Sequence, residues 1–215
     1  MKNKVFLSIE TSISRIFLVA YNKGELFKVQ KNIENSIEID INNLLSKLLK
    51  KAQLEFKHLH FIMVSLGPGS FTGTRIGLSA GKAIALASGK KIYGYSNFET
   101  IYNQAIIDKK IVYNKDINLL IRSSKYDFYH QRIFNSKFED IQITNVKDII
   151  NDYNKDNYFI GNFENIYNLE KYETCIPTKE AVLKTVKELD LPKKNYLNEP
   201  LSPLYIKEHY AKKTR

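Results

Sequence analysis

A glycine-rich run, SLGPGSFTGTRIGLS at residues 65–79, limits the possible folds of this chain more than any other stretch. It follows the apolar run 60–64, which indicates a buried strand, and it leads into a pattern that predicts a helix over 72–88. Glycine tolerates positive φ and proline fixes φ at about −65°. The GPG triplet therefore predicts a rigid turn between strand and helix, with Ser70 or Thr72 as the helix cap.

Three glycines recur at every fourth position of this expected helix. Gly73, Gly77 and Gly81 therefore share one face. Each glycine costs a helix about 1 kcal/mol relative to alanine, so another backbone is expected to approach the bare stripe closely. Two kinds of neighbour satisfy this requirement: an element of a partner protein, or a strand or helix of the same chain.

Hydrophobic periodicity divides the first half of the chain into seven elements. The loop 21–24 ends in glycine and favours a hairpin, and Asn35 and Glu38 have the spacing of a capping box. The expected order is β-β-β-α-β-α-β, with strands at 5–9, 14–20 and 25–30, a helix at 36–56, a strand at 60–66, a helix at 72–88 and a strand at 91–95.

The second half repeats this pattern only faintly. A last helix is predicted from Thr178 to Leu189, with Pro192 ending it. The other expected elements are strands at 117–121, 126–134, 138–143 and 158–161 and a helix at 146–153.

The composition indicates a globular protein, and its lysine pairs are predicted to be solvated surface pairs. Of the residues, 43% are hydrophobic, which is enough for a core, and the formal net charge of +10 favours contact with a polyanion. No run reaches twenty apolar residues and no signal peptide is recognised at the start, so we expect a cytoplasmic location. The single cysteine, Cys175, excludes an internal disulfide and indicates a small buried hydrophobe.

Three stretches of the sequence resemble the TsaB (YeaZ) family. Residues 67–85 are similar to its GPGSFTG signature, with Thr74 in place of the commoner leucine. The run 6–12 resembles the family's first strand, which commonly reads IDTS, and 203–207 resembles its closing P-x-Y-(L/V)-R. Residues 100–200 match only in outline.

The resemblance implies an α/β protein with the actin-like, ribonuclease-H-like ATPase fold, built from two tandem degenerate β-β-β-α-β-α-β subdomains. We expect residues 1–100 to carry the GPGSFTG motif and the docking helices, and 101–215 to form the degenerate second subdomain. The implied function is that of a non-catalytic subunit. It would pair with and activate a catalytic TsaD subunit, which transfers threonylcarbamoyl to the adenosine beside the tRNA anticodon.

The resemblance also implies the partners and the docking surface. Besides TsaD, these partners are a TsaE-type ATPase, tRNA through the complex, and a second copy of the chain when it is isolated; no membrane is implied. We expect the helices at 36–56 and 72–88 to supply the docking face. Its predicted residues are Ile37, Ile41, Leu44, Leu45, Gly73, Gly77 and Gly81.

A second candidate site is the turn after the first strand. ATPases of this fold bring an acid and hydroxyl groups to nucleotide and magnesium there, and Glu10, Thr11 and Ser12 occupy that place. We expect no cofactor on the chain alone, and ATP with magnesium at the boundary between subunits is the weaker hypothesis. Two alternative functions stay open: a free-standing small-molecule kinase or ATP hydrolase using this turn, and a basic RNA-binding module with stacking aromatics.

Metal chemistry is not predicted. The histidines at 58, 60, 130 and 209 lack the H-x-x-x-H spacing that places two imidazoles on one helical face. TsaD carries such a metal-binding motif in the helix that corresponds to 36–56, so the chain is similar to the partner and not to the catalyst.

The second half of many family members begins D-A-R-(R/K)-x-E-V-Y, and residues 122–129 are the nearest match here. Arg122 replaces the leading aspartate, and Asp127 stands at the glutamate position. We predict structural roles for both.

Overall fold

The computed structural model describes residues 4–34, 36–111, 116–135, 137–151, 158–165, 168–169, 171–189 and 201–206. Its elements in chain order are β1 (Phe6–Glu10), β2 (Arg15–Asn22), β3 (Glu25–Asn32), α1 (Ile37–Ala52), the 3-10 turn η1 (Phe56–His58), β4 (Phe61–Ser65), α2 (Phe71–Ser88), β5 (Lys91–Tyr95), α3 (Asn97–Ile107), β6 (Ile117–Arg122), β7 (Asp127–Phe134), β8 (Lys137–Phe138), β9 (Gln142–Asn145), α4 (Val146–Asn151), β10 (Tyr158–Gly161), β11 (Tyr172–Thr174) and α5 (Lys179–Glu188).

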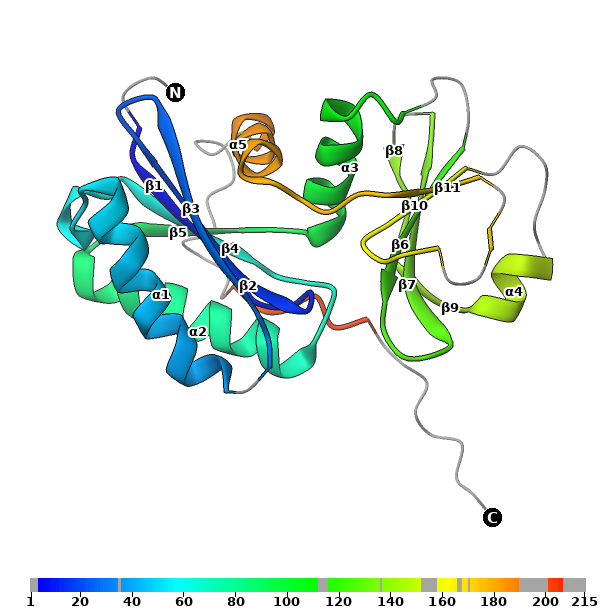
Figure 1. Cartoon of the computed structure of the whole chain (residues 1–215), viewed down its shortest axis with the longest axis horizontal. Helices are drawn as coiled ribbons and strands as arrows, with labels where there is room; N and C mark the ends of the chain where they lie inside the picture. The colour runs from blue at the N-terminus through cyan, green and yellow to red at the C-terminus, as the bar shows by residue number, and fades with distance from the viewer. Residues whose placement is uncertain are drawn as a thin grey trace, which may run out of the picture.

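The first sheet has the strand order β3-β2-β1-β4-β5. β1 pairs antiparallel with β2 and parallel with β4, as expected when a hairpin is followed by helical crossovers. α1 and α2 cover one face and α5 lies on the other, as Figure 1 shows. The predicted β-β-β-α-β-α-β order of the first half is therefore confirmed.

Both faces of the first sheet are buried because its central strands are apolar on both sides. Leu7 and Ile9 of β1 point into the core beneath α1 and α2. Phe6 points to the opposite face, where Val182 and Val186 of α5 join its cluster. This two-sided burial explains why β4 appears in the sequence as a nearly continuous apolar run. β1 is equally buried, although it includes Ser8 and Glu10.

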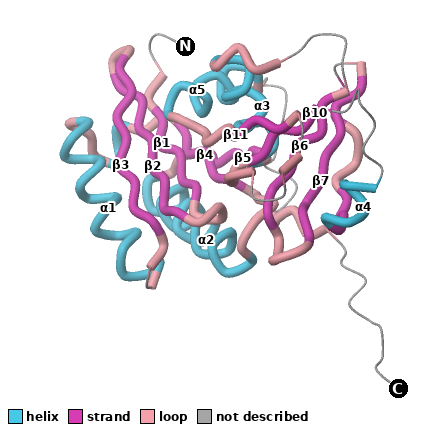
Figure 2. The backbone as a smooth tube through the Cα atoms, turned by 45° about the vertical axis from the view of Figure 1, so that its right-hand side comes forward, coloured by secondary structure: helices cyan, strands magenta, loops and turns pink. Residues whose placement is uncertain are grey.

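The second sheet has the order β11-β10-β6-β7-β8, and β9 also pairs with β7 (Figure 2). α3 and α5 pack against each other between the two sheets. The sequence did not predict α3, although Ser96 and Glu99 form a capping box at its start. It also missed β11, and the strand expected at 138–143 is in fact the two short strands β8 and β9.

The first amphipathic helix is shorter than predicted. α1 ends at Ala52 because Gln53 adopts the left-handed conformation, with φ of 52°, and its N–H bonds to the last turn. Its N-cap is Ser36, whose side chain makes no capping bond, and the expected extension to residue 56 is wrong. The predicted roles of Asn35 and Pro192 fall on residues outside the described ranges.

The segment 201–206 returns from the second half to the first sheet, as the red trace in Figure 1 shows. Leu201 is buried in the core beneath α1 and α2, and the Leu204 N–H donates to the Leu66 carbonyl at 2.8 Å.

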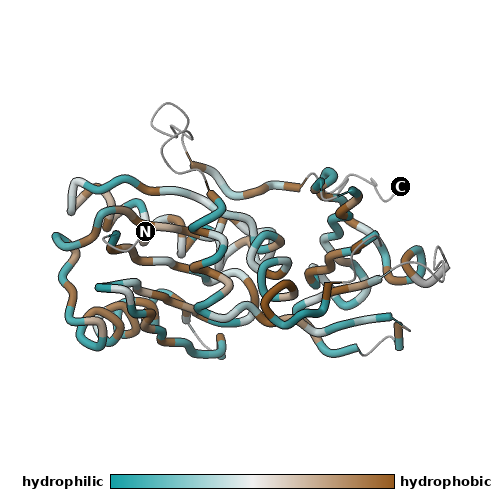
Figure 3. Tube along the Cα trace, turned by 90° about the horizontal axis from the view of Figure 1, so that it is seen from above, coloured by the Kyte–Doolittle hydropathy of each residue, from teal (hydrophilic) through white to brown (hydrophobic). Residues whose placement is uncertain are grey.

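Figure 3 shows polar and apolar residues alternating along the helices. Among the described helices, none is long and apolar enough to cross a bilayer.

Candidate functional site

Residues 67–70, which we call the GPGS turn, connect β4 to α2 as the sequence predicted. Gly67 has φ of 92°, a value that favours glycine, and the peptide bond before Pro68 is cis. The Ser70 hydroxyl accepts the Gly73 N–H at 3.2 Å and caps α2. The N-terminus of α2 is thereby fixed beside the end of β1.

The glycine stripe of α2 faces the chain's own first sheet. A Cβ atom on Gly73 would lie 2.1 Å from the Thr11 carbonyl oxygen, and one on Gly77 would lie 2.3 Å from the Thr11 hydroxyl. On Gly81 it would lie 2.3 Å from a methyl group of Val64. These glycines allow α2 to pack against β1 and β4, which corrects the prediction that a partner protein contacts them.

The apolar residues predicted as a docking face on α1 also point inward. Ile37, Ile41 and Leu45 are buried in the core, and Leu44 packs partly buried against the same cluster. This prediction is wrong at the level of residues, because amphipathic spacing marks the buried face of a helix whatever covers it.

The turn after β1 holds a buried carboxylate. Glu10 is 4% exposed, and its Oε1 accepts hydrogen bonds from the Ser12 N–H, the Ser12 hydroxyl at 2.8 Å and the Ile13 N–H at 3.1 Å. Its Oε2 is buried and has no partner among the described residues. Burial raises the pKa of Glu10, and the bonds from Ser12 and the charge of Arg15 oppose this shift only in part.

Asn97, at the start of α3, links this turn to the GPGS turn. Its Nδ2 donates to the Ser12 hydroxyl at 2.7 Å and to the Pro68 carbonyl at 2.8 Å. Its Oδ1 accepts from the Ser65 hydroxyl at 2.7 Å. Sequence reasoning missed Asn97, and the neighbouring capping box was the one signal that could have placed it at a helix start.

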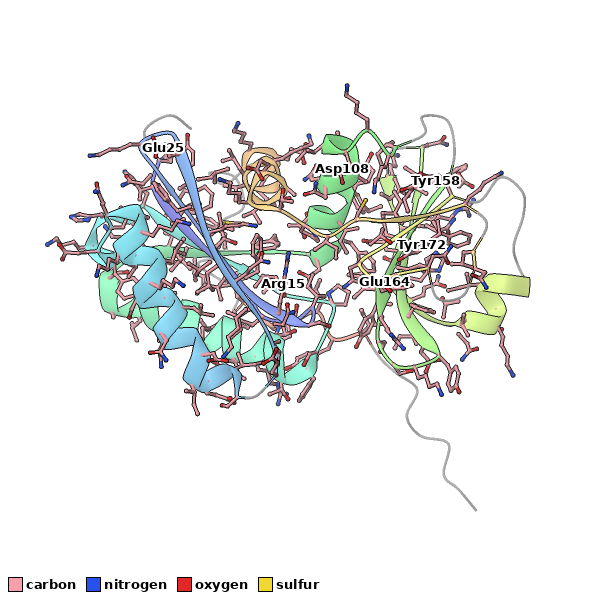
Figure 4. The ribbon with its side chains drawn as sticks, in the orientation of Figure 1. Arg15, Glu25, Asp108, Tyr158, Glu164 and Tyr172 are labelled. Atoms are coloured by element: carbon pink, nitrogen blue, oxygen red, sulfur yellow. The ribbon has the colours of Figure 1, made fainter. Side chains whose placement is uncertain are left out.

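Arg15 lies next to these buried polar residues, between the first sheet and the second half of the chain (Figure 4). Figure 4 shows its side chain between the first sheet and α3. Its guanidinium donates to the Pro177 carbonyl at 2.5 Å, and burial lowers its pKa. This bond attaches the segment before α5 to the first sheet.

Glu10, Thr11 and Ser12 do not fit a nucleotide phosphate with magnesium. The Thr11 hydroxyl donates to the Gly73 carbonyl at 2.6 Å, and the Ser12 carbonyl accepts the Ser70 N–H at 2.7 Å. A Cβ on Gly69 would lie 2.5 Å from that same Ser12 oxygen, so the GPGS turn fills the space in front of these groups. These bonds speak against the predicted cofactor role of this turn, because its polar groups, apart from Glu10 Oε2, bind the chain itself.

The raised pKa of Glu10 predicts a pH-dependent stability. A carboxyl group whose pKa is higher folded than unfolded binds more protons in the folded state between the two values, so stability falls as the pH rises. We expect the wild-type chain to lose stability relative to Glu10→Gln as the pH rises above the ordinary value of 4.5. Each unit of raised pKa contributes about 1.4 kcal/mol. Denaturant unfolding at several pH values measures this, and parallel curves for the two proteins would contradict it.

The hairpin between β6 and β7 confirms a structural role for Asp127. Its carboxylate accepts from the Ser124 hydroxyl at 2.9 Å and from Asn145 Nδ2 at 2.8 Å. Arg122 is exposed, and its Nε donates to the Ser124 carbonyl at 3.2 Å. In the described part of the chain, no three His, Cys, Asp or Glu residues are grouped as metal ligands.

Known proteins with similar sequences identify the family of this chain. The profile of the family described as TsaD, tRNA N6-adenosine threonylcarbamoyltransferase, matches residues 34–142, which is just over half of the chain. A protein of Buchnera aphidicola from Schizaphis graminum, named tRNA threonylcarbamoyladenosine biosynthesis protein TsaB, is 29% identical over 47% of this chain and 48% of its own length. The TsaB of Buchnera aphidicola from Acyrthosiphon pisum is 22% identical over 92% of this chain and 85% of its own length.

The chain belongs to the family described as TsaD, and the curated relatives that it resembles carry the name TsaB. A solved structure from Pseudomonas aeruginosa, described as similar to the peptidase YeaZ, superposes with a TM-score of 0.77 at 14% identity, covering 95% of this chain and 100% of that one. That likeness shows the fold, and the predicted actin-like α/β class is confirmed. The chain spans about half the length of the first TsaB relative that it matches.

Proposed function

We propose that the chain takes part in tRNA threonylcarbamoyladenosine biosynthesis as the non-catalytic partner that activates a TsaD-type enzyme. The TsaB names of its relatives support the pathway. The observation that carries the non-catalytic role is the closed turn at Glu10, Thr11 and Ser12, where hydrogen bonds within the chain occupy the groups that an ATPase of this fold would turn toward phosphate. This closure also argues against the kinase alternative.

Docking of the enzyme is proposed for the outer surface of α1 and α2. Leu86 of α2 is 86% exposed and Ile39 of α1 is 69% exposed, although both are large apolar side chains. Ala83 and Ala87 are exposed beside Leu86, and Lys82 is exposed one turn before it, so this face of α2 combines small apolar side chains with one cation. Such a surface favours packing against a helix of a partner. On the opposite side of α2, the glycines pack against β1 and β4.

The remaining parts of the proposal concern other partners and the division of the chain. A TsaE-type ATPase and tRNA would join the chain through the complex, nucleotide would bind at the subunit boundary, and the isolated chain would pair through the same helices. We keep a cytoplasmic location and a division near residue 100 as proposals. Leu201 and α5 nevertheless contribute to the core of the first sheet.

Reconstitution tests the proposed function. We expect the purified chain alone to form no threonylcarbamoyladenosine on tRNA and to hydrolyse no ATP, and we expect the TsaD-type enzyme of the same genome to gain activity at least tenfold when the chain is added. Mass spectrometry of digested tRNA measures the modified nucleoside. Turnover of ATP by the chain alone, lost in Glu10→Gln, would reject the partner role and restore the kinase alternative.

A further inference from the structure

A cavity of about 550 Å³ opens between the N-terminus of α2, the β6–β7 hairpin and the segment 201–206. Its wall combines apolar and hydroxyl-bearing groups, and none of the described residues that line it is acidic. Residues from all three segments contribute, among them Ser70, Phe71, Ser124, Tyr129, Leu204 and Tyr205. The volume lies in the usual range of ligand sites.

One rim of this cavity is an exposed cluster of two aromatic rings and a cation. Phe71 is 57% exposed and Tyr205 is 56% exposed. The Arg75 guanidinium lies 3.6 Å from the centre of the Phe71 ring, and its Nε and Nη2 donate to the Tyr205 hydroxyl at 3.2 and 3.1 Å. These contacts hold the rings in place while leaving much of their area open to solvent.

The opposite rim is the β6–β7 hairpin, which also carries an exposed aromatic ring next to a cation. Ser123 and Ser124 line the cavity. Next to them, Lys125 Nζ lies 5.1 Å from the centre of the Tyr126 ring, which is 53% exposed. Arg122 adds a second exposed cation, and Asp127 is already bonded to Ser124 and Asn145.

We infer that this cavity and its two rims bind single-stranded RNA directly. Exposed rings and guanidinium planes stack on unpaired bases, and neighbouring cations bind the phosphates between them. The net charge of +10 has the sign that a polyanion requires. The inference rests on the proposed function in one respect: that function identifies the bound strand as a single-stranded loop of tRNA. It adds a contact with tRNA that does not pass through a partner.

The test uses the full chain and a labelled single-stranded RNA of about nine nucleotides, with binding followed by fluorescence anisotropy. We expect Phe71→Ala and Tyr205→Ala each to weaken binding about tenfold. Lys125→Gln should reduce the slope of log affinity against log salt by about 0.7. Tyr205→Phe keeps the ring and loses the bond to Arg75, so binding should stay within about threefold of the wild type.

Phe134 supplies the matched control. It is 46% exposed and has Arg132 at 5.2 Å from its ring centre, at the other end of β7 from the cavity. Phe134→Ala should change binding less than twofold. Equal losses for Phe134→Ala and Phe71→Ala, or no loss in either rim variant with an unchanged melting temperature, would overturn the inference. Full displacement of the strand by AMP at equal nucleotide concentration would also overturn it, because the cavity would then be a mononucleotide site.

Partner pairing measured on the same samples separates this inference from the proposed function. Strand binding by a chain that does not pair with the TsaD-type enzyme would reject the function and keep the RNA surface. Pairing without any strand binding would reject the RNA surface and keep the function.

Discussion

Gly73→Ala is expected to destabilise the chain by about 3 kcal/mol, although alanine favours a helix by up to about 1 kcal/mol. The added Cβ would lie 2.1 Å from the Thr11 carbonyl oxygen, which belongs to the backbone and cannot rotate away. Either α2 moves away from β1 or the turn after β1 shifts. Denaturant unfolding followed by circular dichroism measures the loss of free energy.

Ser79→Ala is the matched control for this change, because Ser79 lies exposed on the same helix. It should leave stability unchanged or raise it by a few tenths of a kcal/mol. A Gly73→Ala protein as stable as the wild type would show that α2 does not lie against Thr11.

Leu86→Asp is expected to weaken pairing with the TsaD-type enzyme at least a hundredfold while leaving the subunit folded. Leu86 is 86% exposed, so the isolated chain loses almost no buried area. In a helix-on-helix interface the aspartate would be buried without a partner, which costs several kcal/mol. Titration calorimetry with the enzyme measures the affinity, and gel filtration of the variant alone checks its fold.

Ile176→Asp serves as the control for pairing. Ile176 is 50% exposed between β11 and α5, on a surface that we do not propose for docking. It should pair like the wild type. If Leu86→Asp pairs normally, or if both variants fail equally, the outer face of α2 is not the docking surface.

The first half of the chain could be predicted well because local signals agree there with the tertiary structure. β1 and β4 are buried on both faces, and Ser70 caps α2 where the sequence placed a cap. In the second half the same signals located β6, β7, α4, β10 and α5, but they missed the shortest strands. β8 has two residues and β11 has three, so neither is long enough to show an alternating pattern.

The candidate site was harder to predict because spacing identifies a face and does not identify its neighbour. Gly73, Gly77 and Gly81 share one face as predicted, yet Thr11 and Val64 of the same chain occupy it. The meeting of Asn97 with Ser12 and Pro68 joins three segments far apart in the sequence. No local pattern reports such a contact, and the same holds for Arg75 and Tyr205.

The return of residues 201–206 to the first sheet makes folding depend on the order of synthesis. Arg75 bonds a residue 130 positions later in the chain, and Leu201 completes a core whose strands end at Tyr95. Contacts of such high sequence separation form slowly, because a long loop must close before they stabilise anything. On the ribosome, β1–β5 emerge before the segment 201–206, so the contacts of Leu201 and Tyr205 with the first sheet and α2 can form only after this segment has left the exit tunnel.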